Sequence, residues 1–258
     1  AVILAFALAA VWTRVAPAFP YPVLTRFAAL GVGSHLVLDL LTPRGTPLFW
    51  PLSPRQFALS WAGDTDPWLW GILAAGLAAA WAWPVRGIGM ARGALAAAAA
   101  YVVFCGMARA TAISRFEDAV IRLGGRPVRS EAYPRYLDPA RWNVVTFGTE
   151  RCWQGFVNAF GGIEGRVRTY FTPPLPARFD SAFTRAYLAW ARAPVARQLA
   201  GAGLREVALY DLRFLGGPEG VPHVVRIVDE GGGHVRHEWV PSSMTRTPDA
   251  DQEYELGK

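Results

Sequence analysis

Charged side chains are distributed very unevenly along this 258-residue chain, and their distribution constrains the fold more than any other feature. Residues 1–108 contain only nine charged side chains, whereas residues 109–258 contain the other 37. Hydrophobic residues make up 52% of the chain, which excludes a disordered or low-complexity protein. We therefore expect a membrane-embedded N-terminal part and a water-soluble C-terminal part.

Four apolar segments lie within the first part, at residues 1–13, 22–41, 67–85 and 87–108. A membrane-spanning helix needs about 20 predominantly apolar residues, and the third segment has 19 residues without a charge. Seven of the eleven tryptophans occur by residue 83, several of them at segment ends, as in an interfacial aromatic belt. The pattern predicts a multi-pass membrane protein, with a buried soluble helix bundle as the alternative.

The net charge of +6 comes from scattered arginines that form no basic run. We therefore expect contacts with lipid headgroups and no nucleic-acid binding. Flanking arginines do not favour either side of the membrane. The chain begins inside an apolar segment and lacks the basic start of a signal peptide, so we expect a truncated first helix.

Beyond residue 125 the spacing of apolar residues changes from that of helices to that of strands. Runs rich in Val, Tyr, Phe and Trp between glycines and prolines predict strands, at residues 142–147, 152–160, 165–171, 206–215, 221–229 and 234–240. Aromatic residues at helical spacing predict one helix over residues 178–192. The expected fold is a membrane α-helical bundle plus an α+β soluble domain, an antiparallel sheet with one packed helix.

The predicted division of the chain has four parts. Residues 1–110 form the transmembrane helical domain, and residues 111–135 form a linker helix and loop. Residues 136–240 form the α+β soluble domain, and residues 241–258 form a disordered tail.

The residues with the clearest chemical potential are His35 and Asp39, which lie four positions apart in an apolar segment. On a helix this spacing places both on one face. Ionisable residues in membrane helices are costly and usually functional. Imidazole and carboxylate also bind zinc and similar ions. A metal-binding pair and a structural His–Asp couple remain alternatives.

Two further residues lie near the expected membrane face. Asp66 opens the third apolar segment, and Arg44 lies in the preceding linker. We expect Asp66 to approach Asp39, and Arg44 to pair with a carboxylate or with an anionic substrate. The remaining histidines, His223, His234 and His237, are interpreted as surface residues, and the Asp211–Arg213 spacing indicates an ion pair on one strand face. Cys105 and Cys152 are not expected to form a disulfide.

The run SHLVLDLLTPRGTPLFWPLSPRQFALSWAGDTDP (residues 34–67) resembles the signature of the YdjM-like predicted membrane-bound metal-dependent hydrolases. Supporting resemblance lies in YLDPARWNVV, LAWARAP and LYDLRF, so that the likeness covers roughly residues 1–239. The His-x-x-x-Asp spacing is also similar to that of zinc-dependent phospholipases C and related nucleases. The family's own N-terminal motifs, a His-bearing helix, Pro-Asp-x-Asp and His-Arg-Gly-x-Thr-His, are absent here and are expected to precede Ala1.

The resemblance implies a location in the cytoplasmic (inner) membrane. It also implies a divalent metal, zinc or else manganese, held by His35 and Asp39 in a set that this chain leaves incomplete. The implied function is hydrolysis of a phosphoester or lipid-type substrate near the membrane by metal-activated water. Asp66 is expected to bind the metal or act as general base, and Arg44 to orient an anionic group. The alternative is a non-enzymatic, membrane-anchored binding or structural protein; its protein partners are not indicated by the sequence.

Overall fold

The computed structural model describes residues 2–15, 18–53, 55–171, 175–198, 206–214, 224–231, 234–240 and 252–255. The chain forms two compact units, Ala1–Ser60 and Trp61–Lys258. The first unit is helical, and the second combines helices with two antiparallel sheets.

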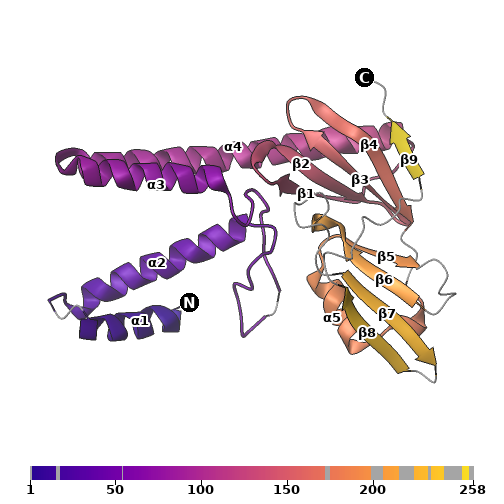
Figure 1. The fold of residues 1–258 in the computed structure, drawn as a ribbon, viewed down its shortest axis with the longest axis horizontal. Coiled ribbons are helices and arrows are strands. Elements are labelled where there is room, and N and C mark those ends of the chain that lie inside the picture. The colour runs from indigo at the N-terminus through magenta and orange to yellow at the C-terminus, as the bar shows by residue number, and fades with distance from the viewer. Residues whose placement is uncertain are drawn as a thin grey trace. The chain divides into compact units, whose positions relative to one another are not determined.

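The first unit contains two helices, α1 (Val2–Val15) and α2 (Tyr21–Leu41), which pack against each other (Figure 1). Pro22 lies in the first turn of α2, where its missing N–H and fixed φ suit a helix start. At 1.5 Å per residue, α2 is about 32 Å long, close to the thickness of a bilayer's hydrocarbon core. It is long and apolar enough to cross a membrane.

The second unit begins with a helical hairpin of α3 (Pro67–Ala82) and α4 (Gly87–Arg122), joined by a short 3₁₀ turn (Pro84–Arg86). A Cβ on Gly76 would lie 2.0 Å from the Cβ of Ala94, so glycine permits the close approach of the two helices. The segment 84–122 also passes the length and hydropathy test for a membrane span. Its 36-residue helix α4 continues through position 110, so the predicted boundary there falls inside one helix.

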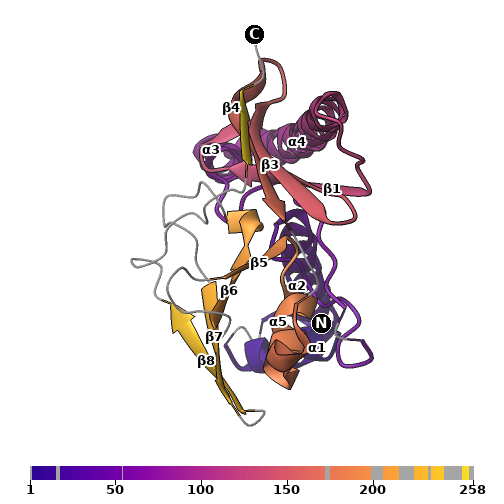
Figure 2. The same ribbon diagram turned by 90° about the vertical axis from the view of Figure 1, so that its right-hand side faces the viewer.

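The first sheet has the strand order β1-β2-β3-β4-β9 and is antiparallel throughout. Its strands are β1 (Arg129–Arg135), β2 (Asp138–Phe147), β3 (Arg151–Asn158), β4 (Gly162–Phe171) and β9 (Gln252–Glu255). The C-terminal half of α4 lies against one face of this sheet (Figures 1 and 2). Phe116 of α4 is fully buried there with Trp142 and Val157.

The second sheet has the order β5-β6-β7-β8 and is also antiparallel. Its strands are β5 (Pro194–Gln198), β6 (Glu206–Asp211), β7 (Val224–Gly231) and β8 (His234–Val240). One face is covered by α5 (Ala182–Trp190) and the 3₁₀ turn before it (Ala177–Phe179), and a second 3₁₀ turn (Leu212–Phe214) follows β6. Phe179 and Tyr187 pack there with Leu209 and Ile227.

The predicted helices, strands and antiparallel pairing are observed, but the soluble part has two sheets instead of one. The sequence prediction assigned α5 as the sole packed helix, whereas α4 extends 12 residues beyond position 110 and covers the first sheet itself. Because each sheet buries its apolar face against its own helix, one shared sheet does not form.

Three strands were not predicted. β1 and β5 are rich in Arg, Ser, Glu and Gln, so they lack the apolar alternation that indicates a strand. Residues 252–255, assigned to a disordered tail, form β9, whose register places Glu253 beside Arg168 of β4. Ion pairing with Arg166 and Arg168 stabilises this strand, and hydrophobic patterning does not reveal such pairing. The remainder of the predicted tail lies outside the described residues.

Candidate functional site

The helix α2 places His35 and Asp39 on one face, one turn apart. The Nε2 atom of His35 lies 3.4 Å from Oδ2 of Asp39. Both side chains are accessible, His35 at 75% and Asp39 at 43% of their maximal exposure. The predicted pairing of the two residues is therefore observed, with ring nitrogen and carboxylate facing each other.

Asp39 also takes part in ending the helix. Its backbone carbonyl accepts hydrogen bonds from the backbone N–H and the hydroxyl of Thr42, at 3.0 and 2.9 Å. These bonds satisfy a carbonyl that the end of the helix would otherwise leave unpaired. They fix the last turn of α2, and with it the backbone that carries the His35–Asp39 pair.

The segment after α2 folds back to the helix end. Thr46 and Phe57 exchange backbone hydrogen bonds of 2.8 and 3.0 Å, and the N–H of Leu59 donates to the carbonyl of Leu40. Gly45 has φ +78°, and a Cβ there would lie 3.0 Å from the carbonyl oxygen of Phe57, so this turn requires glycine. The Thr-x-x-Gly-Thr element of the sequence signature is thus the turn that closes this loop, and it carries Arg44 at an exposed position.

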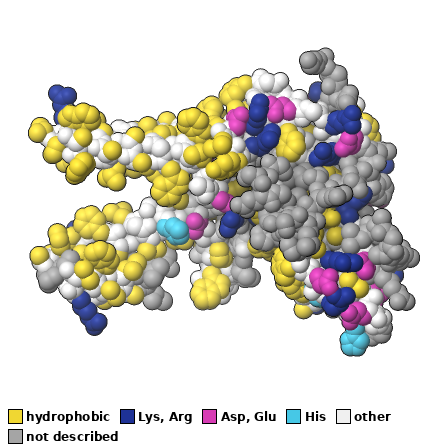
Figure 3. Space-filling model, in the orientation of Figure 1, with side chains coloured by type: hydrophobic (Ala, Val, Ile, Leu, Met, Phe, Trp, Pro, Cys, Tyr) yellow, Lys and Arg dark blue, Asp and Glu magenta, His cyan; other side chains and the backbone are white. Residues whose placement is uncertain are grey.

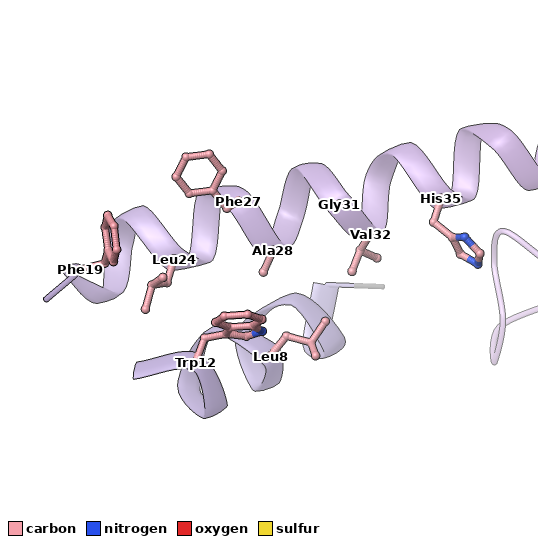
Figure 4. A pocket seen from close by; sticks show the side chains of 9 residues that line it. All are labelled: Leu8, Trp12, Phe19, Leu24, Phe27, Ala28, Gly31, Val32 and His35. Carbon is pink, nitrogen blue, oxygen red and sulfur yellow. The ribbon is translucent and has the colours of Figure 1, made fainter. Parts of the chain in front are cut away.

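An apolar groove of about 540 Å³ lies between α1 and α2 and ends at His35 (Figure 4). On α2 its lining follows one helical face, through Leu24, Ala28, Gly31, Val32 and His35. Leu8 and Trp12 of α1 lie opposite, four positions apart, with their side chains towards α2. His35 is the polar end of an otherwise apolar surface.

Asp66 has a well-defined structural role in the second unit. Its Oδ1 accepts hydrogen bonds from the backbone N–H groups of Trp68 and Leu69, both at 3.0 Å, so it caps the start of α3. Its Oδ2 accepts the hydroxyl of Tyr101 from α4, at 2.8 Å. The approach of Asp66 to Asp39 stays a prediction, because the two residues belong to different compact units.

The His35–Asp39 pair fits a divalent metal in donor type and spacing, but two donors do not close a zinc site. Within the part of the chain that the structure describes, no group of three or more His, Cys, Asp or Glu side chains is arranged to hold a metal ion. The pair therefore serves as two ligands of a larger set, or as a hydrogen-bonded couple.

The structure also describes most of the other residues that the sequence analysis named. Asp211 and Arg213 form a fully buried ion pair of 3.0 Å, although Arg213 follows the strand in a 3₁₀ turn. His237 lies 2.9 Å from the hydroxyl of Ser181 and packs against the ring of Phe183 at a tilt of 38°, whereas His234 is exposed. The third, His223, lies outside the described residues. Both cysteines are buried, and neither forms a disulfide.

Sequence reasoning missed the groove and the Asp66–Tyr101 contact. The spacing of small and apolar residues on α2 and the Leu8/Trp12 pair signal a groove only when α1 and α2 are considered together. The contact between Asp66 and Tyr101 joins residues 35 positions apart, and no local pattern reveals it.

Residues 1–112 match the family model described as "YdjM inner membrane protein". The resemblance identified in the signature after α2 is therefore confirmed over this segment, which contains His35, Asp39, Arg44 and Asp66. The resemblance noted for the C-terminal part stays a prediction. No curated protein and no solved structure matches the chain.

Proposed function

We propose that this chain, whose residues 1–112 match the YdjM inner membrane protein family, is a metal-dependent hydrolase of the inner membrane. The observation that carries the proposal is the His35–Asp39 pair, 3.4 Å apart and accessible, at the polar end of an apolar groove. The family match and two helices of membrane-spanning length support a multi-pass membrane location.

The proposed roles follow from the chemistry of each side chain. His35 and Asp39 supply an imidazole nitrogen and a carboxylate oxygen as metal ligands. When bound, a divalent ion supplies Lewis-acid activation of water and of a phosphoryl oxygen. Arg44, exposed in the turn after α2, orients an anionic group through charge-assisted hydrogen bonds. Asp66 is the proposed further ligand or base, and its Oδ2 is oriented by Tyr101.

The groove favours a lipid-type phosphoester as substrate. Its lining residues are apolar except for His35, and its volume lies in the range of ligand pockets. An apolar tail in the groove would bring an attached polar group to His35 and Asp39. A small, fully hydrated phosphoester would leave this apolar surface unused.

The second candidate is a membrane-anchored binding or structural protein in which His35 and Asp39 are only a hydrogen-bonded couple. The 3.4 Å distance between Nε2 of His35 and Oδ2 of Asp39 supports this candidate as well as the first one, because a hydrogen-bonded couple needs no third partner. The two candidates differ in one property, the binding of a metal.

The test is elemental analysis of the purified, detergent-solubilised chain after zinc or manganese loading and desalting. We expect His35→Ala and Asp39→Ala each to lower the metal content strongly, since each removes a ligand. His234→Ala is the matched control, because it removes an exposed histidine of β8 and should leave the metal content unchanged. Metal content in His35→Ala and Asp39→Ala equal to that of His234→Ala would refute the hydrolase proposal and favour the second candidate.

A further inference from the structure

The end of the first sheet nearest the α3–α4 hairpin carries large apolar side chains at its turns. The β1–β2 turn consists of Tyr136 and Leu137, and the β3–β4 turn carries Phe160; all three are more than half exposed. Figure 3 shows hydrophobic side chains covering much of the α3–α4 pair, while charged side chains gather around the sheets. The exposed turns lie at the border between these two kinds of surface.

Two contacts within the second unit fix these turns against the helices. The indole N–H of Trp68, in the first turn of α3, donates to the carbonyl of Leu137 at 3.1 Å. The ring of Phe160 stacks on Phe104 of α4, with ring centroids 6.0 Å apart. Both turns therefore lie beside the helical hairpin, one against the start of α3 and the other against residue 104 of α4.

That level coincides with the expected edge of the membrane. Residues 88–107 of α4 rise about 30 Å, the thickness of the hydrocarbon core of a bilayer. Arg109, the next charged residue of α4, forms an ion pair with Glu131 of β1 at 3.0 Å. The hydrocarbon core therefore ends near residue 107, next to Phe104 and the two turns.

The two residues of the β1–β2 turn are not the ones that favour a turn of this type. Two-residue hairpin turns favour Asn-Gly or Asp-Gly, because their residues need positive φ. Here Leu137 has φ +65°, which a bulky residue rarely adopts. Local rules are broken chiefly where function requires it, so the Tyr-Leu pair indicates a role for its side chains.

The opposite end of the same sheet provides an internal comparison. The β2–β3 turn, residues 148–150, exposes Thr149 and Glu150. It is separated from the Tyr136–Leu137 turn by the ten residues of β2, about 33 Å. Large apolar side chains are thus found at the turns beside the helical hairpin, while this distal turn is polar.

We propose that Tyr136, Leu137 and Phe160, together with Trp68, form a membrane-docking surface by which the first sheet inserts its two turns into the lipid headgroup region. Aromatic side chains are enriched at this depth because one end is apolar and the other polar. The occupant of the surface is the lipid bilayer that surrounds α4. The inference requires α4 to cross the membrane and is independent of any metal or hydrolase activity.

The test uses the full chain reconstituted in vesicles of phosphatidylcholine and phosphatidylglycerol. Variants with one added cysteine, Phe160→Cys and Leu137→Cys, carry an environment-sensitive fluorophore, with Thr149→Cys as the matched control at the distal turn. Leu95→Cys, on the exposed face of α4, reports the hydrocarbon core. The two native cysteines are buried, and the unsubstituted chain measures their background labelling.

We expect blue-shifted emission at positions 137 and 160, quenching by lipids with a nitroxide near the headgroup, and loss of quenching by aqueous iodide. Position 149 should show the reverse, and position 95 should be quenched by a nitroxide deep in the acyl chain. Water-like emission at 137 and 160 while 95 is deeply quenched would overturn the proposal. Water-like emission at position 95 would also overturn it, because α4 would then not cross the bilayer.

Discussion

Both halves of α4 carry large apolar side chains, but these side chains have different surroundings. In the N-terminal half Ile88, Leu95 and Val103 are all more than half exposed, whereas Phe116 and Val120 in the C-terminal half are fully buried beneath the first sheet. The two halves form one uninterrupted helix. The difference therefore arises from what covers each half and not from local backbone structure.

This comparison shows that one continuous helix carries an exposed apolar half and a covered half. Exposed apolar side chains along about 20 residues are unfavourable in water and favourable in lipid. From about residue 108 onward the sheet covers the helix, and Ala108, Ala112 and Phe116 repeat there at helical spacing on one face. Because the helix is continuous, the first sheet is held at a fixed distance from the apolar half.

The largest effect is expected from a substitution in the buried, C-terminal half of α4. Phe116→Ala removes a fully buried ring and should lower the free energy of unfolding by about 3–5 kcal/mol. Leu95→Ala, at an exposed position of the other half, should change it by only about 0.5 kcal/mol. Denaturant unfolding in detergent micelles, followed by near-UV circular dichroism of the sheet tryptophans, measures both. Equal effects would show that the two halves of α4 are covered alike.

A smaller effect is expected at Gly155, which lies against the ring of Phe116. A Cβ on Gly155 of β3 would lie 2.5 Å from the ring of Phe116, so Gly155→Ala forces the ring or the strand to move. We expect a loss of about 1–3 kcal/mol in unfolding free energy. Gly93→Ala is the control on the apolar half, where no atom lies within 4 Å of the added Cβ. Its effect should be neutral or slightly stabilising, and the reverse order would contradict the comparison.

Alkaline pH should weaken the first sheet through two of its buried tyrosines, which belong to a core cluster other than the one that contains Phe116 of α4. Burial raises the pKa of Tyr170 to about 12, and it also raises the pKa of Tyr133. A raised pKa in the folded state gives stability that is complete below the unfolded value, about 10, and that is lost as pH rises towards 12. The expected loss from Tyr170 is on the order of 1–3 kcal/mol.

The measurement is the unfolding midpoint as a function of pH, together with tyrosinate absorbance. Tyr170→Phe should flatten the dependence above pH of about 10, because it removes the titrating group. Tyr136→Phe, at an exposed turn position, should leave the dependence unchanged. A slope that Tyr170→Phe does not alter would assign the pH effect to other groups.

Much of the fold follows from patterns that act over a few residues. The four N-terminal helices and six of the strands were predicted, because apolar periodicity and Gly/Pro boundaries are local signals. The predicted aromatic packing is also observed, with Tyr187 of α5 and Phe179 of the preceding 3₁₀ turn packed on the second sheet. The division into two sheets was missed, because it depends on α4 covering the first one.

The candidate site, too, could be predicted only where its residues lie close together in the sequence. The spacing of His35 and Asp39 placed them on one helical face, and the structure brings Nε2 and Oδ2 to 3.4 Å. Neither the apolar groove that ends at His35 nor the partners of Asp66 could be predicted. Those features join side chains from different helices. The spacing of apolar residues within one helix does not reveal which helix it packs against.

The sequence by itself determined which segments are helix or strand, where apolar residues concentrate, and that His35 and Asp39 share a helix face. These properties depend on periods of 3.6 and 2 residues, which any short window contains. Only the tertiary structure decided that α4 has an exposed apolar half and a sheet-covered half, and that Trp68 and Phe104 hold two apolar turns beside its midpoint. The physical reason is that burial depends on contacts between residues far apart in the chain, and such contacts exist only once the elements have packed.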